Sequence, residues 1–318
     1  MKKTGIIVIL LTNLLVLLNG QTLEERENGI VARNQIKSKT QWDYKYTNGV
    51  LANTGSKVSV TTYDHAGNIL EKDILNSKGA VVSSEKYEYD DNENRTYYLR
   101  NTTNGRYEKR SQYDNRNNLM VEAGFNGAEN FKNTYTYGDD NKLQQIIFTI
   151  NNRVQDKHVY NNKGNMSMVD IYTGGASLTS KLKLVYDTKG NIIEQTVLSL
   201  NNKVLEKTTY KYDVDSRLLT EEKTANGVLA YRTSYDYDSK GNLLTVSEES
   251  SSEKKFVKKS FTYDSAGNLT EYKWHRRPDE PFNVKTFTYD SKGICLTEHT
   301  LYPTTKYELM SKFQYEFY

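Results

Sequence analysis

The chain has 318 residues, of which 43 are lysine or arginine and 40 are aspartate or glutamate, so the formal net charge is +3. The two signs are interspersed without a basic tail or stripe, which excludes the electrostatic footprint of a nucleic-acid-binding protein. The one cysteine, Cys295, excludes an internal disulfide, and the three prolines are as few as long paired sheets require.

Residues 1–20 have the layout of a secretory signal peptide. Lys2 and Lys3 precede an apolar run over residues 6–18, and residues 19–21 resemble a cleavage region. The run is short for a bilayer span, so we expect no membrane span after signal removal; an uncleaved anchor is the alternative. We therefore predict an exported protein that is periplasmic, cell-surface or secreted, and the lack of disulfides favours a bacterial envelope.

Residues 21–35 carry no repeat signal, and we expect a mobile lead-in there. Trp42, Tyr44 and Tyr46 then alternate with polar residues, as in a strand that begins a first hairpin. No linker interrupts the pattern that follows, so the sequence predicts one domain over residues 36–318, although length alone would suggest two.

A short phrase of tyrosine, aspartate, two variable residues and glycine returns about every 25 residues along this domain. Its clearest copies place tyrosine, aspartate and glycine at Tyr63, Asp64 and Gly67, at Tyr186, Asp187 and Gly190, at Tyr237, Asp238 and Gly241, and at Tyr263, Asp264 and Gly267. Other copies begin at Tyr89, Tyr113, Tyr137, Tyr160, Tyr212, Tyr289 and, truncated, Tyr315. Self-similarity at this period indicates a repeat architecture, so we assign these residues a structural role.

Each phrase reads as a hairpin turn. A three-residue hairpin loop commonly ends in a left-handed residue, which glycine adopts readily, and an aspartate before the loop can accept hydrogen bonds from turn amides. If Asp64 pairs with Asn68 across the loop, Tyr63 faces Ile69 on the same side of the sheet. Such an aromatic–aliphatic cross-strand pair contributes about 0.2–1 kcal/mol.

The residues before each phrase read as a half-buried strand. The position two before the tyrosine is often aromatic, as at Tyr87, Tyr210 and Phe261, with a polar residue between. Second turn signals such as Asn104 and Gly105 lie midway between phrases, so each period holds two strands. We predict an all-β fold, a long antiparallel hairpin meander of about 20–22 strands that forms a twisted or spiral open sheet or a partial shell.

The two faces of this sheet allow alternative interpretations. Residues 85–88 and 253–259 place charges on both faces, whereas a transmembrane barrel, the alternative fold, needs an outward apolar band. The recurring aromatic residues would form a continuous ladder along one face. If exposed, the ladder could stack against sugar rings; if buried, it is the core, which the scarcity of Val, Ile and Leu favours.

The residue types that chemistry requires are scattered. The four histidines do not cluster at metal-ligand spacing, and the acidic turn over residues 90–94 lacks the spacing of a calcium loop. The repeated aspartates come once per period and so lie too far apart to act as a catalytic pair. We expect no catalytic residues, no metal and no cofactor. Cys295 stands where other copies carry Ile or Leu, which favours a buried small hydrophobe over a reactive thiol.

One loop interrupts the repeat pattern, and it supplies the candidate binding residues. They are Trp274, His275, Arg276, Arg277 and Phe282, where other copies have a compact turn. Loops carry function more often than the scaffold that supports them, and a solvated insertion is the alternative.

The Tyr-Asp-x-x-Gly-Asn phrase, with an aromatic residue two places earlier, resembles the YD repeats of RHS-type proteins over residues 40–318. The resemblance implies hairpin sheets that spiral into hollow shells; some members enclose a toxin domain, and others are adhesion or carbohydrate-binding scaffolds. This chain has far fewer copies, no toxin-like domain after Tyr318, and Asn242 after Gly241 where the family more often has Arg. It therefore resembles a small exported member.

We expect a non-enzymatic exported scaffold that binds a glycan or a protein at the cell envelope or outside the cell. Its expected partners are a carbohydrate or an envelope protein. The alternatives are a shell-like component related to toxin cocoons, or an assembly module in which the edges at residues 42–46 and 313–318 pair between chains. A hydrolase is a further alternative that would need clustered carboxylates or histidines in the fold.

Overall fold

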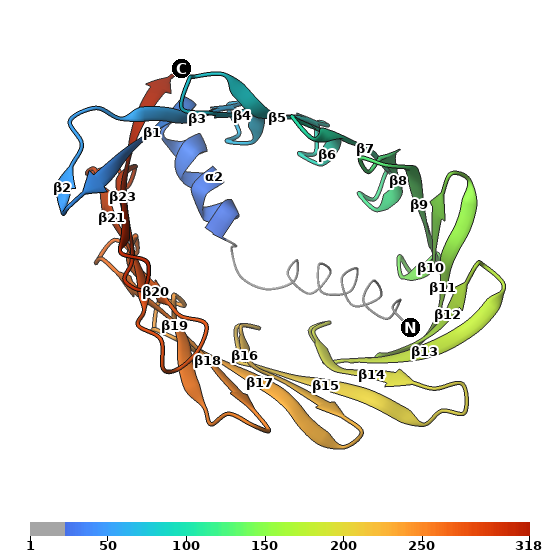
Figure 1. Ribbon diagram of the computed structural model, residues 1–318. Coiled ribbons are helices and arrows are strands. Elements are labelled where there is room, and N and C mark those ends of the chain that lie inside the picture. The colour runs from blue at the N-terminus through green and yellow to red at the C-terminus, as the bar shows by residue number, and fades with distance from the viewer. Residues whose placement is uncertain (1–22) are drawn as a thin grey trace.

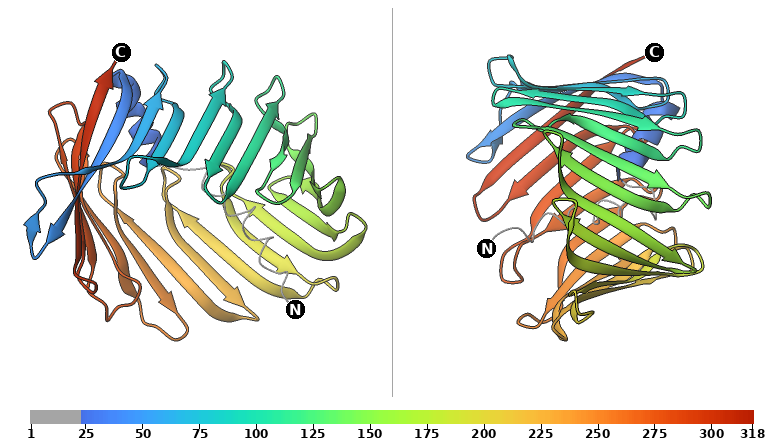
Figure 2. Two further views of the ribbon diagram at one scale, coloured as in Figure 1. Left: turned by 45° about the horizontal axis from the view of Figure 1, so that its top comes forward. Right: turned by 90° about the vertical axis from the view of Figure 1, so that its right-hand side faces the viewer.

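The computed structural model describes residues 23–318, so the signal peptide expected over residues 1–20 lies outside them. The described chain begins with helix α2 (Leu23–Arg33) and continues as 23 strands of one antiparallel sheet. Figure 1 shows these strands arranged as a ring that encloses α2, and Figure 2 shows hairpin ends along both rims.

Consecutive strands of the sheet are joined by short turns. Their bounds are β1 (Ile36–Thr47), β2 (Val50–Leu51), β3 (Ser56–Tyr63), β4 (Ile69–Leu75), β5 (Val81–Tyr89), β6 (Arg95–Thr102), β7 (Gly105–Tyr113), β8 (Leu119–Phe125), β9 (Asn130–Tyr137), β10 (Leu143–Ile150), β11 (Arg153–Lys163), β12 (Met166–Thr173), β13 (Ser177–Tyr186), β14 (Ile192–Leu198), β15 (Val204–Tyr212), β16 (Leu218–Ala225), β17 (Val228–Tyr237), β18 (Leu243–Ser250), β19 (Phe256–Tyr263), β20 (Leu269–Trp274), β21 (Asn283–Tyr289), β22 (Cys295–Tyr302) and β23 (Tyr307–Phe317). The prediction of an all-β hairpin meander is confirmed.

The ends of the sheet pair with each other, which closes it. Strand β1 pairs with β3 on one side and with β23 on the other, where Lys39 lies opposite Tyr315 and Trp42 opposite Lys312. Within the described chain, 22 strands therefore form a closed barrel, and β2 is an extra strand that pairs with β1. The open sheet expected from the sequence is corrected to a closed one. The two predicted edges, residues 42–46 and 313–318, are therefore not open, because the strands that contain them, β1 and β23, pair with each other.

Helix α2 lies inside the ring and packs against the seam between the chain's first and last strands (Figure 1). Val31 of α2, Ile36, Tyr63 and Ile294 form one buried cluster. A Cβ on Gly67 would lie 2.4 Å from the backbone oxygen of residue 28, so the helix approaches the first repeat turn too closely for a side chain. The lead-in predicted over residues 21–35 thus contains a packed helix.

The repeat turns have the predicted register. In the first copy, the amide of Asp64 donates to the carbonyl of Asn68 at 2.9 Å, and Tyr63 lies opposite Ile69. The Asp64 carboxylate accepts from the backbone and side-chain amides of Asn68 at 2.8 and 3.1 Å. Gly67 has a φ of 88°, the left-handed conformation expected there. The same Asp–Asn clasp closes the copies at Asp90, Asp114, Asp187, Asp238 and Asp264.

The repeat tyrosine also connects neighbouring hairpins. The hydroxyl of Tyr212 donates to the carbonyl of Ile192 at 2.9 Å, and Ile192 is the apolar residue that follows the preceding phrase. We call each such bond a rung. Further rungs join Tyr89 to Ile69, Tyr113 to Arg95, Tyr137 to Leu119, Tyr237 to Leu218, Tyr263 to Leu243, Tyr289 to Leu269 and Tyr315 to Cys295. Each of these tyrosines thus holds two hairpins together.

The tyrosine face of the sheet points into the barrel. Tyr63 packs against α2, and Tyr289 lines a cavity with α2 residues, so alternate residues on the same strands also face inward. The largest core cluster lies on this face, around Val169 and Leu182. The outward neighbours of the tyrosines are exposed and polar, as at Glu88, Gln112, Lys211, Asp236 and Thr288.

Replacement of Tyr212 by phenylalanine tests the rungs, because it removes the hydroxyl and keeps the ring. We expect Tyr212→Phe to lower the free energy of unfolding by about 1 kcal/mol in urea denaturation. Tyr172→Phe is the control, since the Tyr172 ring faces Lys157 at 5.2 Å and its hydroxyl makes no hydrogen bond within residues 23–318. Equal losses in the two variants would contradict the role of the rung.

Glu194 makes stability depend on acid pH. A hydrogen bond from Lys207 at 2.7 Å, supported by Lys183 at 3.0 Å, lowers the pKa of Glu194 from 4.5 to about 2. Because the folded-state pKa is lowered, this contribution is present above pH 4.5 and is lost as the pH falls toward 2. We expect Glu194→Gln to lower the thermal midpoint at neutral pH, with the difference from wild type vanishing near pH 2.

The exposed Glu253 provides the control for this pH series, since no ion pair holds its side chain within the described residues. Glu253→Gln should leave the midpoint unchanged across the same range. A Glu194→Gln deficit that persists at the acid end would show that packing, rather than charge, causes it.

Candidate binding site on the inner wall

Four aromatic rings form a row on the inner wall, which we call the first aromatic row. Tyr87 of β5 and Tyr98 of β6 lie opposite each other with ring centroids 5.1 Å apart. Tyr107 of β7 follows at 5.7 Å, and Phe131 of β9 at 6.0 Å. Gly124, on the intervening strand β8, has no side chain, so Tyr107 and Phe131 can face one another across it.

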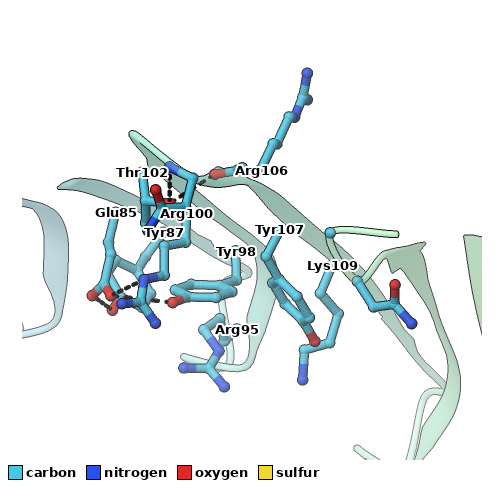
Figure 3. Close-up of a pocket in the computed structure, with 13 residues that line it drawn as sticks. Glu85, Tyr87, Arg95, Tyr98, Arg100, Thr102, Arg106, Tyr107 and Lys109 are labelled. Carbon is cyan, nitrogen blue, oxygen red and sulfur yellow. Dashed lines mark hydrogen bonds and ion pairs between the residues drawn. The ribbon is translucent and has the colours of Figure 1, made fainter. Parts of the chain in front are cut away.

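A cavity of about 760 Å³ borders the three tyrosines of this row. Charged side chains from three strands share it: Glu85 of β5, Arg95 and Arg100 of β6, and Lys109 of β7. Figure 3 shows the rings of Tyr98 and Tyr107 side by side with Arg95 and Lys109 beside them, while Arg106 points away from the group. The volume lies in the range of small-molecule sites.

Glu85 organises one end of the cavity. Its carboxylate accepts from the hydroxyls of Tyr87 at 2.7 Å and Tyr98 at 3.3 Å, and the Arg100 guanidinium lies 3.6 Å away. Burial, followed by the hydrogen bond and charge of Glu85, raises the pKa of Tyr87 well above its ordinary value. The same causes raise the pKa of Tyr98. Both hydroxyls therefore stay neutral donors, and the carboxylate keeps its capacity to accept further hydrogen bonds.

The four cations that line the cavity are not equally compensated, and Arg106 is paired with Glu108. Lys109 is paired with Glu122 at 2.5 Å, and Arg100 with Glu85. Arg95 forms no ion pair within residues 23–318; its guanidinium lies 5.8 Å from the Tyr87 ring centroid and 5.6 Å from that of Tyr98. Cation–π contacts of this length hold the group over the rings and leave its N–H donors available.

The predicted loop residues do not form one site. Trp274 ends β20 and stacks on Tyr272 at 4.8 Å, and Tyr272 stacks on Phe261 at 5.0 Å, which gives a second inner-wall aromatic row. Arg276 and Arg277 are exposed beyond the end of the strand.

His275 and Phe282 hold the loop closed. His275 is buried, and its ring nitrogens lie 2.7 Å from the Val257 carbonyl and 3.0 Å from the Glu280 carbonyl. Phe282 stacks on the imidazole at 4.2 Å. The structure thus brings two of the five predicted residues into a loop-closing contact and places Trp274 in an aromatic row.

Sequence reasoning missed the first aromatic row as a site, although it noted the aromatic ladder. The available signal was Arg95, which stands six residues after Tyr89, where other copies carry Ile or Leu. A cation at an inward position of the repeat marks this copy as different. Tyr97 and Tyr98 stand two and three positions after Arg95, and Tyr107 stands twelve positions after it.

Residues 23–318 lack a metal cluster and a membrane-spanning helix. Those residues contain no group of three or more His, Cys, Asp or Glu side chains that could hold a metal ion. No helix among them is long and apolar enough to cross a membrane. Cys295 lies in a cavity beside α2, and burial raises the pKa of its thiol to about 11.

Comparison with known proteins gives one family. The sequence model described as Teneurin YD-shell matches residues 151–316. No curated protein matches the chain. Two of the similar solved structures are a Photorhabdus luminescens Tc holotoxin pore (12% identity, 81% of this chain and 19% of that one, TM-score 0.30) and a porin-like protein from Bacteroides uniformis (11%, 89% and 97%, TM-score 0.29). The chain thus spans about a fifth of the length of that toxin chain.

Inner-wall tyrosines should ionise at a higher pH than tyrosines in the unfolded chain. Burial, with the charge of Glu221 next, raises the pKa of Tyr235 to about 12, and burial and Asp187 raise that of Tyr212 to about 12. Because the folded-state pKa is raised, the stability that these neutral tyrosines contribute is present below pH 10 and is lost as the pH rises toward 12. We expect the tyrosinate absorbance of the native protein to rise at higher pH than in denaturant, together with loss of strand circular dichroism. Coincident curves would contradict this burial.

Proposed function

Because the chain belongs to the Teneurin YD-shell family, we propose that it is a non-enzymatic exported shell scaffold that binds a glycan or a protein segment on its inner wall. The observation that carries the proposal is the first aromatic row beside the cavity of about 760 Å³. Its tyrosines are half-buried, so part of each ring stays accessible to a ligand.

The chemistry of this row suits a ligand with both apolar and hydroxyl surfaces. Aromatic faces pack against the apolar face of a sugar ring, while phenol hydroxyls and charged groups bind its polar edge. Tyr107 supplies a ring, Glu85 supplies acceptors and Arg95 supplies donors within one cavity. The same groups would also accept an extended peptide.

Several observations support a binding role over catalysis. The repeated aspartates are engaged in turn clasps, where the Asn242 amide, for example, lowers the pKa of Asp238. The histidines also have structural contacts: His65 stacks on Tyr318 at 3.9 Å, His158 is buried, and His299 lies 2.7 Å from Glu308. His275 closes the loop described above.

A second candidate function, a shell that encloses a chain segment, is favoured by α2. The helix lies inside the closed ring and buries Val31 in a cluster with wall residues (Figure 1). The inner wall therefore already holds one segment of this chain, and we include this shell role as the alternative to ligand binding.

Glycan-array and pull-down assays on the protein without residues 1–20 test the proposal. We expect a specific ligand whose affinity falls at least about tenfold in the Tyr98→Ala and Tyr107→Ala double variant, since each ring loses its stacking contact. Tyr97→Ala is the matched control, because Tyr97 lies on the opposite face under Arg110 at 4.4 Å.

Two outcomes would change the assignment. If only Trp274→Ala reduced binding, the site would move to the second aromatic row. If both assays gave no ligand for the folded protein, the binding proposal would fail and the shell role would remain.

A further inference from the structure

Arg95 stands at the repeat position where the other copies of this chain have an apolar residue or cysteine. In most other copies, the residue six places after the tyrosine faces that tyrosine across the hairpin, as Ile69 faces Tyr63 and Leu119 faces Tyr113. Arg95 takes this place opposite Tyr89. This copy therefore lacks the aromatic–aliphatic cross-strand pair and has a cation on the inner wall instead.

The wall around Arg95 leaves this charge free for a ligand. Lys109 and Arg100 each have a carboxylate partner, whereas the guanidinium of Arg95 meets only aromatic rings within the described residues. The charge of Arg95 reaches across the cavity to Tyr107. It acts to lower the pKa of Tyr107, although burial has the larger effect and raises that pKa overall. A guanidinium in a concave wall attracts anions and binds a carboxylate through two parallel hydrogen bonds.

A second group in the cavity has the opposite preference. The Glu85 carboxylate is a pure acceptor, and the hydroxyls of Tyr87 and Tyr98 occupy only part of its capacity. It suits hydroxyl donors and repels further carboxylates. A matching ligand therefore combines one negative group, several hydroxyls and a ring that stacks on Tyr107.

We propose that the cavity binds an acidic glycan, with a sugar carboxylate at Arg95, sugar hydroxyls at Glu85 and a sugar ring on Tyr98 or Tyr107. This inference rests on the proposed function and narrows its ligand class. A polyacidic peptide carries the negative groups without the hydroxyls and would meet the Glu85 charge along its length, so the glycan is the better match.

Calorimetric titration with an oligogalacturonate and with its methyl ester isolates the charged group, because the two probes share length and hydroxyls. We expect the wild-type protein to bind the acid at least about tenfold more tightly than the ester, with an advantage that shrinks as salt rises. Arg95→Gln should remove the advantage. Arg110→Gln is the matched control, since Arg110 is paired with Glu108 at 3.2 Å on the opposite face.

The outcomes separate this inference from the proposed function. Equal binding of acid and ester, or an acid preference that survives Arg95→Gln, would overturn the inference and leave glycan binding in place. Tighter binding of poly-glutamate than of the oligogalacturonate would also overturn it. If neither sugar bound and the array identified a different ligand, the inference of an acidic glycan would be overturned and the proposed binding function would stand. If Arg95→Gln failed to fold, the acid-to-ester ratio and its salt dependence in the wild-type protein would still decide.

Discussion

The rung from a repeat tyrosine to the preceding copy, which eight of the eleven copies form among the described residues, is the interaction on which this architecture depends. A hairpin by itself fixes only two strands, and its turn clasp, such as Asp64 with Asn68, is local. The rung adds a bond from Tyr212 to Ile192, which belongs to the hairpin before. The ring and the hydroxyl of one side chain thus act at two levels, within a hairpin and between hairpins. This arrangement recurs in most copies around the ring (Figure 1).

The seam requires contacts that the repeat does not supply. Tyr63, in the first copy, has no earlier phrase to bond, and its ring is buried under α2 instead. Its carbonyl accepts a hydrogen bond from the hydroxyl of Tyr318, whose ring stacks on His65. The first turn and the last residue are thereby joined across the seam that β1 and β23 form, and α2 covers the joint from inside.

The sequence predicts the turns and the register of single hairpins, but it does not predict how the hairpins close into a ring. The register of Tyr63 with Ile69 followed from turn chemistry alone, because all its determinants lie within seven residues. Closure did not follow, since Lys39 and Tyr315 pair across almost the whole chain, and the repeat signal at Tyr315 does not show that its strand pairs with the first strand. Helix α2 is short and polar, which hid it. The first aromatic row was also out of reach, because its rings come from separate hairpins and meet only once the register of each strand is known; Arg95 alone hinted at it. The signal peptide stays a prediction.

Closure also makes the number of repeats a discrete quantity. An open solenoid can gain or lose one unit at its end with little effect on the others. In a closed barrel, circumference, strand tilt and stagger are linked, so an inserted copy would have to displace the alignment of β1 with β23. A single unusual residue such as Arg95 leaves the pairing of β1 with β23 in place, whereas an added copy would change the circumference over which these two strands must meet. The ring therefore ties the number of its copies to its circumference and to the register of its seam.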